Sequence, residues 1–247
     1  MIIEDVSTSD NIYVVSWDCA MKSIACVIMR INPCYMSDVY YALQPRSDDL
    51  NMKFRQKRHN EVLESAVVIE KIICGDIFAG KNLADIPWNE KVVTIKRFIE
   101  DAATTIAQIV KAHRASPRVY VIIEKQPNQI IGKYGAKINL NNIAVEHFLY
   151  YHFCNIYPTS VISPKKKLEV AFAGNHYVGG TGNGAYGARK SHCVRNFHAA
   201  GRIFPQVRTA AALMPKELVC YIDDIADAFC SGYIFAAEMS NSFTKKI

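Results

Sequence analysis

The apolar run "SPRVYVIIEKQ" (116–126) places the strongest constraint on the fold of this 247-residue chain. A proline opens the run, and the β-branched and aromatic residues that follow are typical of a strand buried on both faces. Helical periodicity flanks it on both sides, over 89–113, where Asn89 is expected to cap the helix, and over 139–153. A buried strand between two helices predicts an α/β fold in which this strand is central and parallel to a neighbour. The residues expected to form the apolar stripe of the first helix are Val93, Ile95, Phe98, Ile99, Ala102, Ile106 and Ile109.

Short apolar runs supply the other strands. The runs 11–18, 23–31 and 38–44 follow one another through short connections, which favours an antiparallel meander. A fourth short strand is predicted at 159–164, where a proline stops it. Together with the central strand these runs predict a mixed sheet. Further helices are predicted over 189–201 and after Asp223, whereas the glycine-rich stretch 174–188 is expected to be irregular.

Composition indicates a folded globular protein, since half of the residues are hydrophobic and 21% are charged. We expect a single domain over 1–247. The net charge of +6 is compatible with a polyanionic partner but does not require one. The eight cysteines form no C-x-x-C pair and lie mostly in apolar runs, as expected of reduced core thiols. No apolar stretch reaches the roughly 18 residues of a membrane span, so a soluble intracellular protein is expected.

Carboxylates follow the buried segments at three places. Asp18 ends the first strand and Glu124 ends the central one. Asp224 and Asp227 open the last helix and share one face at i, i+3, although Asp223 pairs equally well with Asp227 at i, i+4. Spacing alone therefore leaves Asp223 or Asp224 open. Each acid alone is more often a cap or a strand end, but together they are expected to converge at one edge of the sheet.

Such a cluster of like charges requires a compensating partner. Like-charged pairs at helical spacing cost roughly 0.2–0.5 kcal/mol each. Carboxylate oxygens without histidine or cysteine suit Mg²⁺ or Mn²⁺. Two such ions about 3.5–4 Å apart can activate a water and stabilise the leaving oxygen of a phosphodiester. Zinc is not expected, because the nearby His147, His152 and Cys154 lie in apolar surroundings without a second group of ligands.

Three segments, "VVSWDCAMKSIACVIM", "VIIEKQ" and "DDIADAF", resemble the acidic motifs of RuvC-like Holliday junction resolvases in the ribonuclease H-like superfamily, particularly those of poxviruses and other large DNA viruses. The resemblance implies a ribonuclease H-like fold, with a mixed five-stranded central sheet flanked by helices. It also implies two Mg²⁺ ions per active site, for which Mn²⁺ substitutes, and selects Asp224 over Asp223. The implied metal ligands, which are also catalytic residues, are Asp18, Glu124, Asp224 and Asp227. The chain departs from the family at Cys19, where glycine is common, and insertions are expected near 45–88 and 174–188.

The resemblance further implies an endodeoxyribonuclease that resolves four-way DNA junctions by paired hydrolysis in DNA recombination, repair and replication. It points to a symmetric homodimer, and to the host cytoplasm if the protein is viral. The aromatic residues of 148–153 are too many for one buried stripe, so part of this cluster is expected to face the partner. Two alternatives stay open: a nuclease acting on RNA–DNA hybrids or other branched DNA, and a non-catalytic DNA-binding module.

Basic residues near the predicted acidic edge are candidates for phosphate contacts. They are Lys133, Lys165, Lys166, Lys167, Arg189, Lys190 and Arg195, of which Lys190 or one of the lysines 165–167 is expected near the scissile phosphate. A junction-facing loop with Gln126, Asn128, Lys133 and Tyr134 is expected after Glu124. Nucleoside triphosphate binding is not expected. Although "GTGNGAYGARKS" contains glycines and a lysine, Lys190 comes three residues after Gly187 instead of directly after it, as a P-loop requires.

Overall fold

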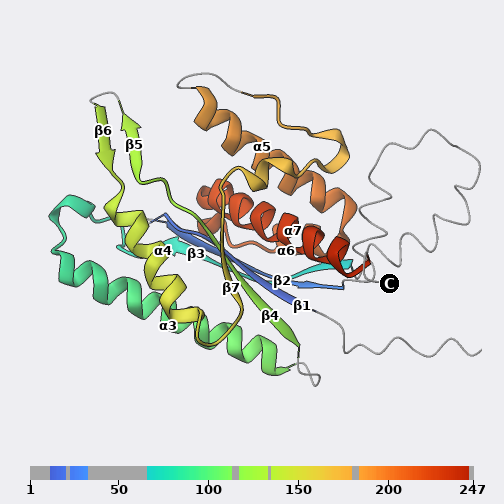
Figure 1. Cartoon of the computed structure of the whole chain (residues 1–247), viewed down its shortest axis with the longest axis horizontal. Helices are drawn as coiled ribbons and strands as arrows, with labels where there is room; N and C mark the ends of the chain where they lie inside the picture. Colours follow the sequence, from blue (N-terminus) through green and yellow to red (C-terminus); the bar gives the residue numbers. More distant parts are fainter. Residues whose placement is uncertain are drawn as a thin grey trace, which may run out of the picture.

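Five strands form one central sheet in the structure, a computed structural model that describes residues 12–20, 23–32, 66–112, 117–132, 135–179 and 184–244 (Figure 1). The strand order is β3-β2-β1-β4-β7. The strands span Ile12–Asp18 (β1), Ser23–Ile31 (β2), Val67–Asp76 (β3), Arg118–Glu124 (β4) and Thr159–Ile162 (β7). The first three pair antiparallel, whereas β4 pairs parallel with both β1 and β7. The predicted mixed five-stranded central sheet is therefore confirmed.

The register of β1 and β4 brings two predicted site residues together. Trp17 lies opposite Ile123 in the parallel pair, so Asp18 and Glu124 follow at the same edge of the sheet. On the other side of β1, Asp18 lies opposite Ala25 of β2. The sheet thus ends in two neighbouring carboxylates from segments more than 100 residues apart.

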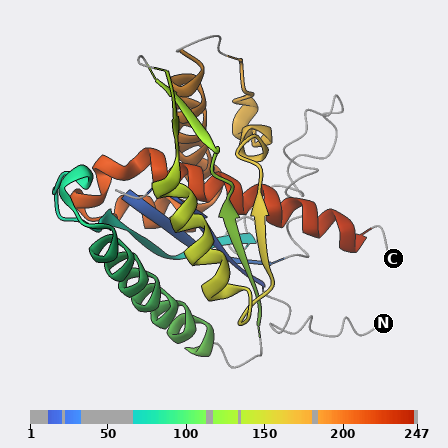
Figure 2. The same ribbon diagram turned by 60° about the vertical axis from the view of Figure 1, so that its left-hand side comes forward.

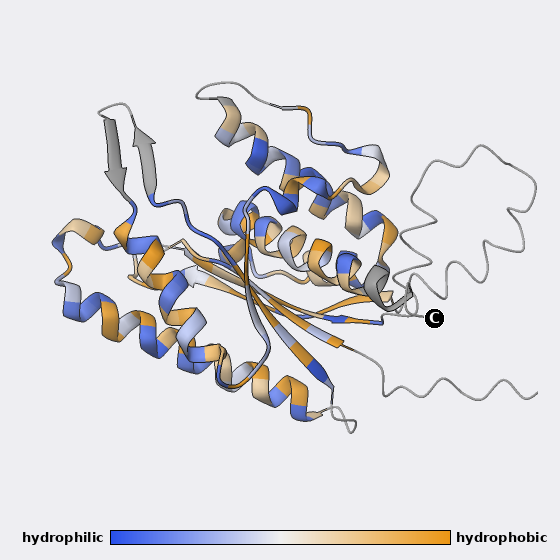
Figure 3. Cartoon of the chain, in the orientation of Figure 1, coloured by the Kyte–Doolittle hydropathy of each residue, from blue (hydrophilic) through white to orange (hydrophobic). Residues whose placement is uncertain are grey.

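Helices cover both faces of the sheet (Figure 2). The helices α3 (Trp88–Ala112) and α4 (Leu140–Phe153) pack on one face against side chains of β1 such as Tyr13, Val15 and Trp17. The helices α5 (Gly184–Ile203), α6 (Pro205–Ala212) and α7 (Ile222–Thr244) form the other core with Ile12 and Val14. Because β1 alternates its side chains between these two cores, all seven of its residues are buried. Figure 3 shows the resulting contrast between the hydrophobic central strands and α3, which is amphipathic and carries both hydrophilic and hydrophobic residues.

The first long helix confirms the predicted periodicity but corrects two details. It begins at Trp88, so Asn89 lies inside its first turn and does not cap it. Ile95, Ile99, Ala102 and Ile106 form the buried stripe, whereas Val93 is 66% exposed. Val93 therefore lies outside the buried face of the helix, although the spacing predicts it in the apolar stripe.

The third strand of the meander is Val67–Asp76, which pairs along β2 with a bulge between Ile28 and Met29. This segment lies within the region expected as an insertion, and its apolar residues complete the central sheet. The strand predicted at 38–44 lies outside the described residues, as do 45–65.

Two predicted loops contain regular structure. After Glu124 the chain forms a two-stranded hairpin of β5 (Gln129–Gly132) and β6 (Gly135–Ile138), which projects from the sheet in Figure 1. The glycine-rich stretch is irregular over 175–179, but α5 already begins at Gly184, so the prediction of an irregular stretch is wrong for 184–188. In the described part of the chain, none of the helices combines the length and hydrophobicity of a membrane span.

Candidate active site

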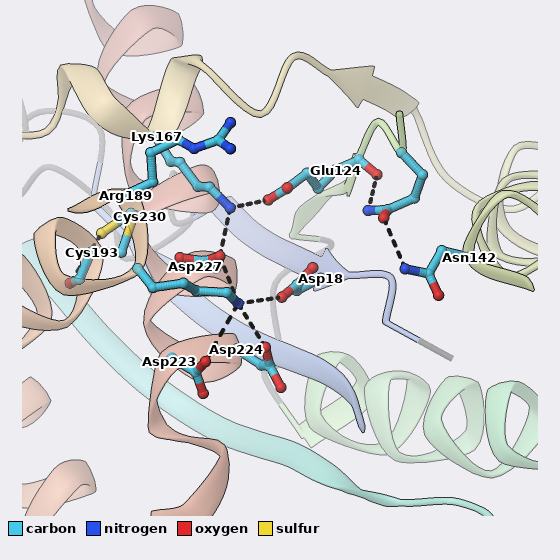
Figure 4. A network of polar contacts seen from close by, with 12 residues as sticks. Asp18, Glu124, Asn142, Lys167, Arg189, Cys193, Asp223, Asp224, Asp227 and Cys230 are labelled. Carbon is cyan, nitrogen blue, oxygen red and sulfur yellow. Dashed lines mark hydrogen bonds and ion pairs between the residues drawn. The ribbon is translucent and has the colours of Figure 1, made fainter. Parts of the chain in front are cut away.

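The four acids that the motifs single out meet at one edge of the sheet (Figure 4). Asp18 comes from the end of β1, Glu124 from the end of β4, and Asp224 and Asp227 from the first two turns of α7. Taken as whole residues, backbone included, all four are less than 10% exposed. They are held there because α7 packs directly across β1 and β2 with its buried face.

Lys167 joins two of these acids. It lies on η3, a short 3₁₀ helix (Lys166–Glu169) that follows β7. Its Nζ donates to Glu124 Oε2 and to Asp227 Oδ2, both at 2.6 Å, and its side chain is only 6% exposed. The side chain is thus enclosed by the acids and does not lie on the surface, and its predicted contact with a DNA phosphate stays a prediction.

Lys190 lies between Asp18, Asp224 and Asp227. It comes from the second turn of α5, and its Nζ donates to Asp224 Oδ1 at 2.7 Å. The same Nζ lies 3.0 Å from Asp227 Oδ2 and 3.6 Å from Asp18 Oδ2. On the far side, the Ser23 hydroxyl donates to Asp224 Oδ2 at 2.6 Å. Three carboxylates from two distant segments thus surround a single ammonium group.

Asp223 differs from Asp224 in exposure. Its side chain is 43% exposed and lies 3.7 Å from Lys190 Nζ, whereas the side chain of Asp224 is 12% exposed and makes the shorter contact. The geometry thus places Asp224 inside the cluster and Asp223 at its rim.

Burial controls the protonation of this cluster. Burial raises the pKa of Asp18 well above its usual value, and the nearby Glu124 carboxylate raises it further. Burial also raises the pKa of Glu124, although Lys167 opposes the shift. Burial alone would lower the pKa of both lysines, but the surrounding carboxylates raise it, so both ammonium groups stay charged. Mainly because of burial, Asp18 and Glu124 are therefore harder to ionise than carboxylates exposed to solvent.

The carboxylates of the cluster outnumber its lysines. Five carboxylates, including Asp223, face two lysines, which leaves three negative charges unmatched when all of them are ionised. Asp227 Oδ2 serves both lysines, whereas its buried Oδ1 has no hydrogen-bond partner among the described residues. Lys190 Nζ is already a cation surrounded by carboxylate oxygens.

In the described part of the chain, no three His, Cys, Asp or Glu side chains stand close enough to form a ready-made metal cage. The two lysine side chains reach in between the acids. Oxygen-only ligands such as these suit Mg²⁺ or Mn²⁺.

A second polar network lies directly behind Glu124. Gln126 is buried, and its side-chain amide donates to the Glu124 carbonyl at 3.3 Å and accepts from Asn142 at 3.4 Å. Its backbone N–H donates to Oε2 of the buried Glu146 at 2.6 Å. The expectation that Gln126 faces a DNA junction is therefore wrong, because the side chain is folded back toward α4.

The other predicted DNA contacts lie around the cluster. Lys165 and Arg195 are exposed. Lys166 is partly exposed and pairs with Glu238 and Glu169. Arg189 is partly buried, and its guanidinium lies 6.0 Å from the centre of the Tyr186 ring. Lys133 and Tyr134 lie outside the described residues.

The motifs did not identify Ser23 or Glu146. Glu146 shares a helical face with the buried Leu149 and Phe153, three and seven residues further on, so a carboxylate on an apolar stripe was a usable signal. The hydrogen bond from Ser23 to Asp224 spans 201 residues, and no local pattern predicts it.

The chain matches no protein-family model and no curated protein. Among solved structures it is similar to the Fowlpox virus resolvase in complex with Holliday junction DNA, at 15% identity and a TM-score of 0.44, covering 92% of this chain and 99% of that one. It is also similar to RuvC of Thermus thermophilus (11% identity, TM-score 0.49, covering 94% and 97%). A third similar structure is the yeast mitochondrial Holliday junction resolvase (15% identity, TM-score 0.43, covering 98% and 87%). Because the sequence identities are 11–15% and all three TM-scores are below 0.5, these similarities do not establish a function for this chain. The side chains of the site have to supply the argument.

Proposed function

We propose that this chain is a metal-dependent endodeoxyribonuclease that resolves four-way DNA junctions by paired phosphodiester hydrolysis. The observation that carries the proposal is the buried cluster of Asp18, Glu124, Asp224 and Asp227, whose negative charge exceeds that of its two lysines. Burying carboxylates in excess of their counter-ions is costly for a purely structural site. The cost is explained when the cluster takes up a further cation.

The four acids would hold divalent ions through their carboxylate oxygens, and Asp227 Oδ1 is available for this role. When bound, Mg²⁺ supplies Lewis-acid stabilisation of phosphoryl oxygens and a water of lowered pKa. Ser23 fixes one oxygen of Asp224, so the other is left for Lys190 or for an ion.

The two lysines have different roles in this proposal. Lys167 is enclosed and holds Glu124 and Asp227 at a fixed separation. Lys190 is more exposed, at 17% against 6%, so its ammonium group is the one that can contact a phosphate at the mouth of the site. Contact with the non-bridging oxygens of the scissile phosphate would stabilise the charge that develops there.

The surrounding basic side chains would position the DNA arms. Lys165, Arg189 and Arg195 are the described candidates with solvent access, together with the partly exposed Lys166. Contacts to phosphates give affinity and register without reading sequence, as a structure-selective nuclease requires. We also infer that two copies act together as a homodimer in processing recombination and replication intermediates, because one chain contributes one acidic cluster and a junction needs two cuts.

The deciding experiment is cleavage of an end-labelled four-way junction in Mg²⁺, in Mn²⁺ and in chelator, beside a linear duplex and an RNA–DNA hybrid of matched sequence. We expect symmetric cuts in the junction with either ion, and none in chelator. Preferential cutting of the hybrid would favour a hybrid-specific nuclease of the same fold. Tight junction binding without cleavage under any metal condition would identify a non-catalytic DNA-binding module.

A further inference from the structure

Glu146 is a buried carboxylate that the proposed chemistry leaves without a role. It lies on α4 and is 9% exposed. Among the described residues it forms no ion pair, and its Oε2 accepts a hydrogen bond from the backbone N–H of Gln126 at 2.6 Å. A buried carboxylate needs such a donor, and hydrogen bonds to charged acceptors are stronger than neutral ones. The donor lies two residues after Glu124, at the point where β4 leaves the sheet.

Three hydrogen bonds hold the backbone at this point. The N–H of Lys125 donates to the carbonyl of Ile162 on β7 at 2.9 Å. The side chain of Gln126 donates to the carbonyl of Glu124 at 3.3 Å. The N–H of Gln126 is held by Glu146 from α4. The peptide units on either side of Lys125 are therefore fixed by β7, by the chain itself and by α4.

On the helix side, Glu146 is anchored by a helix that packs into the core. Val145, Leu149 and Phe153 of α4 are fully buried in the core, and the Phe153 ring lies 5.9 Å from that of Trp17 on β1. Trp17 directly precedes Asp18. The same helix thus packs beneath one acid of the cluster and, through Glu146, holds the strand end that carries another.

We propose that Glu146 is a positioning residue: by holding the Gln126 N–H, it fixes the direction in which the Glu124 carboxylate enters the acidic cluster. The inference rests on the proposed nuclease function. It assigns to Glu146 an acceptor oxygen at a fixed place, whereas its negative charge is not needed at the site. Glutamine offers a carbonyl oxygen at the same position, so Glu146→Gln keeps the hydrogen bond and Glu146→Ala removes it.

The activity test compares these two variants with Val145→Ala, which opens a cavity on the same helix and leaves the hydrogen bond intact. Loss of a residue that orients a metal ligand typically lowers metal affinity or activity by about 10- to 100-fold. We expect Glu146→Ala to lower kcat on the four-way junction by about that factor, with KM and junction binding unchanged, and Glu146→Gln to stay within about threefold of the wild type. Val145→Ala should lower the melting temperature while kcat, measured well below melting, stays near that of the wild type.

A second readout does not depend on activity. Amide hydrogen exchange over 124–127, followed in the metal-free protein, reports the Gln126 N–H directly. We expect faster exchange in Glu146→Ala, and wild-type protection in Glu146→Gln and Val145→Ala. Slow exchange in Glu146→Ala would overturn the proposal, whether or not the protein cuts DNA.

The remaining outcomes are also decisive. A Glu146→Gln variant as slow as Glu146→Ala would show that the charge itself is used, which contradicts a positioning role. Equal losses of kcat in Glu146→Ala and Val145→Ala would show that lower folding stability, and not the lost hydrogen bond, slows the reaction. That result would contradict the positioning role. If the wild type fails to cut any junction, the nuclease proposal fails, and the exchange experiment alone still decides whether Glu146 holds this strand end.

Discussion

At the residue scale, the acidic cluster is held together by residues that bring opposite charge into a buried place. Asp18, Glu124, Asp224 and Asp227 are expected to be indispensable for hydrolysis, because in the proposed function each would contribute a carboxylate oxygen to the same metal site. Changing any one of them to its amide should lower the cleavage rate by at least about 10³-fold, or about 4 kcal/mol of barrier. Junction binding should persist, since the changes remove only negative charge.

Asp223→Asn is the matched control for these substitutions. Its side chain is 43% exposed and lies at the rim of the cluster, so we expect activity close to that of the wild type. Rates and affinities on the same labelled junction check both expectations. Full activity in Asp224→Asn together with inactivity in Asp223→Asn would reverse the assignment of the two neighbours.

Lys167 gives a second prediction at this scale. Lys167→Met keeps the length of the side chain but leaves the buried oxygens of Glu124 and Asp227 without their donor. Breaking a buried pair from one side costs about 3–5 kcal/mol of folding stability. Because Mg²⁺ would neutralise the same carboxylates, adding it should raise the melting temperature of this variant more than that of the wild type.

Lys166→Met provides the comparison, since the neighbouring lysine pairs with Glu238 and Glu169 in solvent. Thermal melts of both variants with and without Mg²⁺ should show a large effect at Lys167 and a small one at Lys166. Equal effects at the two positions would mean that the Lys167 bridge adds no stability.

At the scale of elements, the sequence predicted those segments whose identity depends on local pattern. The strands β1, β2, β4 and β7 and the helices α3 and α4 lie where periodicity and breakers indicated. The sequence alone does not decide the element at Val67–Asp76, because an apolar run without alternation fits a helix as well as a strand and only pairing with β2 decides. The convergence of the acids followed from strand ends and helix starts.

The lysine bridge could not be predicted in the same way. Lys167 pairs with residues 43 and 60 positions away, and nothing local distinguishes it from the exposed Lys165. A run of three lysines is normally solvated. The fold alone decides which of the three is directed inward, because η3 turns only Lys167 toward the end of β4.

The position of α7 depends on a glycine. A Cβ added to Gly232 would lie 2.8 Å from Ser16 Cβ on β1 and 2.3 Å from Met29 Cε on β2. Met29 can rotate its terminal methyl away, but Ser16 Cβ is fixed to a buried strand two residues before Asp18. Gly232 therefore allows α7 to approach β1 closely enough for Asp227 to stand beside Asp18.

Gly232→Ala is expected to destabilise the protein. Overpacking typically costs about 1–3 kcal/mol, and the gain in helix propensity returns about 1 kcal/mol, so the net loss of folding stability should be about 0–2 kcal/mol. Gly187→Ala in α5 is the matched control, because an added Cβ there has no atom within 4 Å, and it should raise stability slightly. Urea denaturation of both variants checks the opposite signs, and a stabilised Gly232→Ala would contradict the close packing of α7.

At the scale of the whole molecule, the exposed aromatic residues bear on how copies associate. Of the aromatic residues at 148–153, Phe153 is buried and Phe148 packs partly against the core, whereas Tyr150 and Tyr151 are 38% and 71% exposed. Tyr150 and Tyr151 are thus the members of this cluster that remain available to a partner. Aromatic side chains are enriched at protein interfaces.

The final prediction is that the protein acts as a two-fold homodimer through this face of α4. A four-way junction has near two-fold symmetry, and a two-fold pair presents two acidic clusters to it at once. Light scattering should give about twice the monomer mass of 27.7 kDa. Tyr151→Glu should shift the mass toward the monomer, whereas Val178→Glu, at an exposed apolar position elsewhere, should not.

On a supercoiled cruciform plasmid the wild type should yield linear product directly, while Tyr151→Glu, or the wild type mixed with excess Asp224→Asn, should accumulate nicked circles. Paired cuts by a protein that stays monomeric at micromolar concentration would refute the dimer.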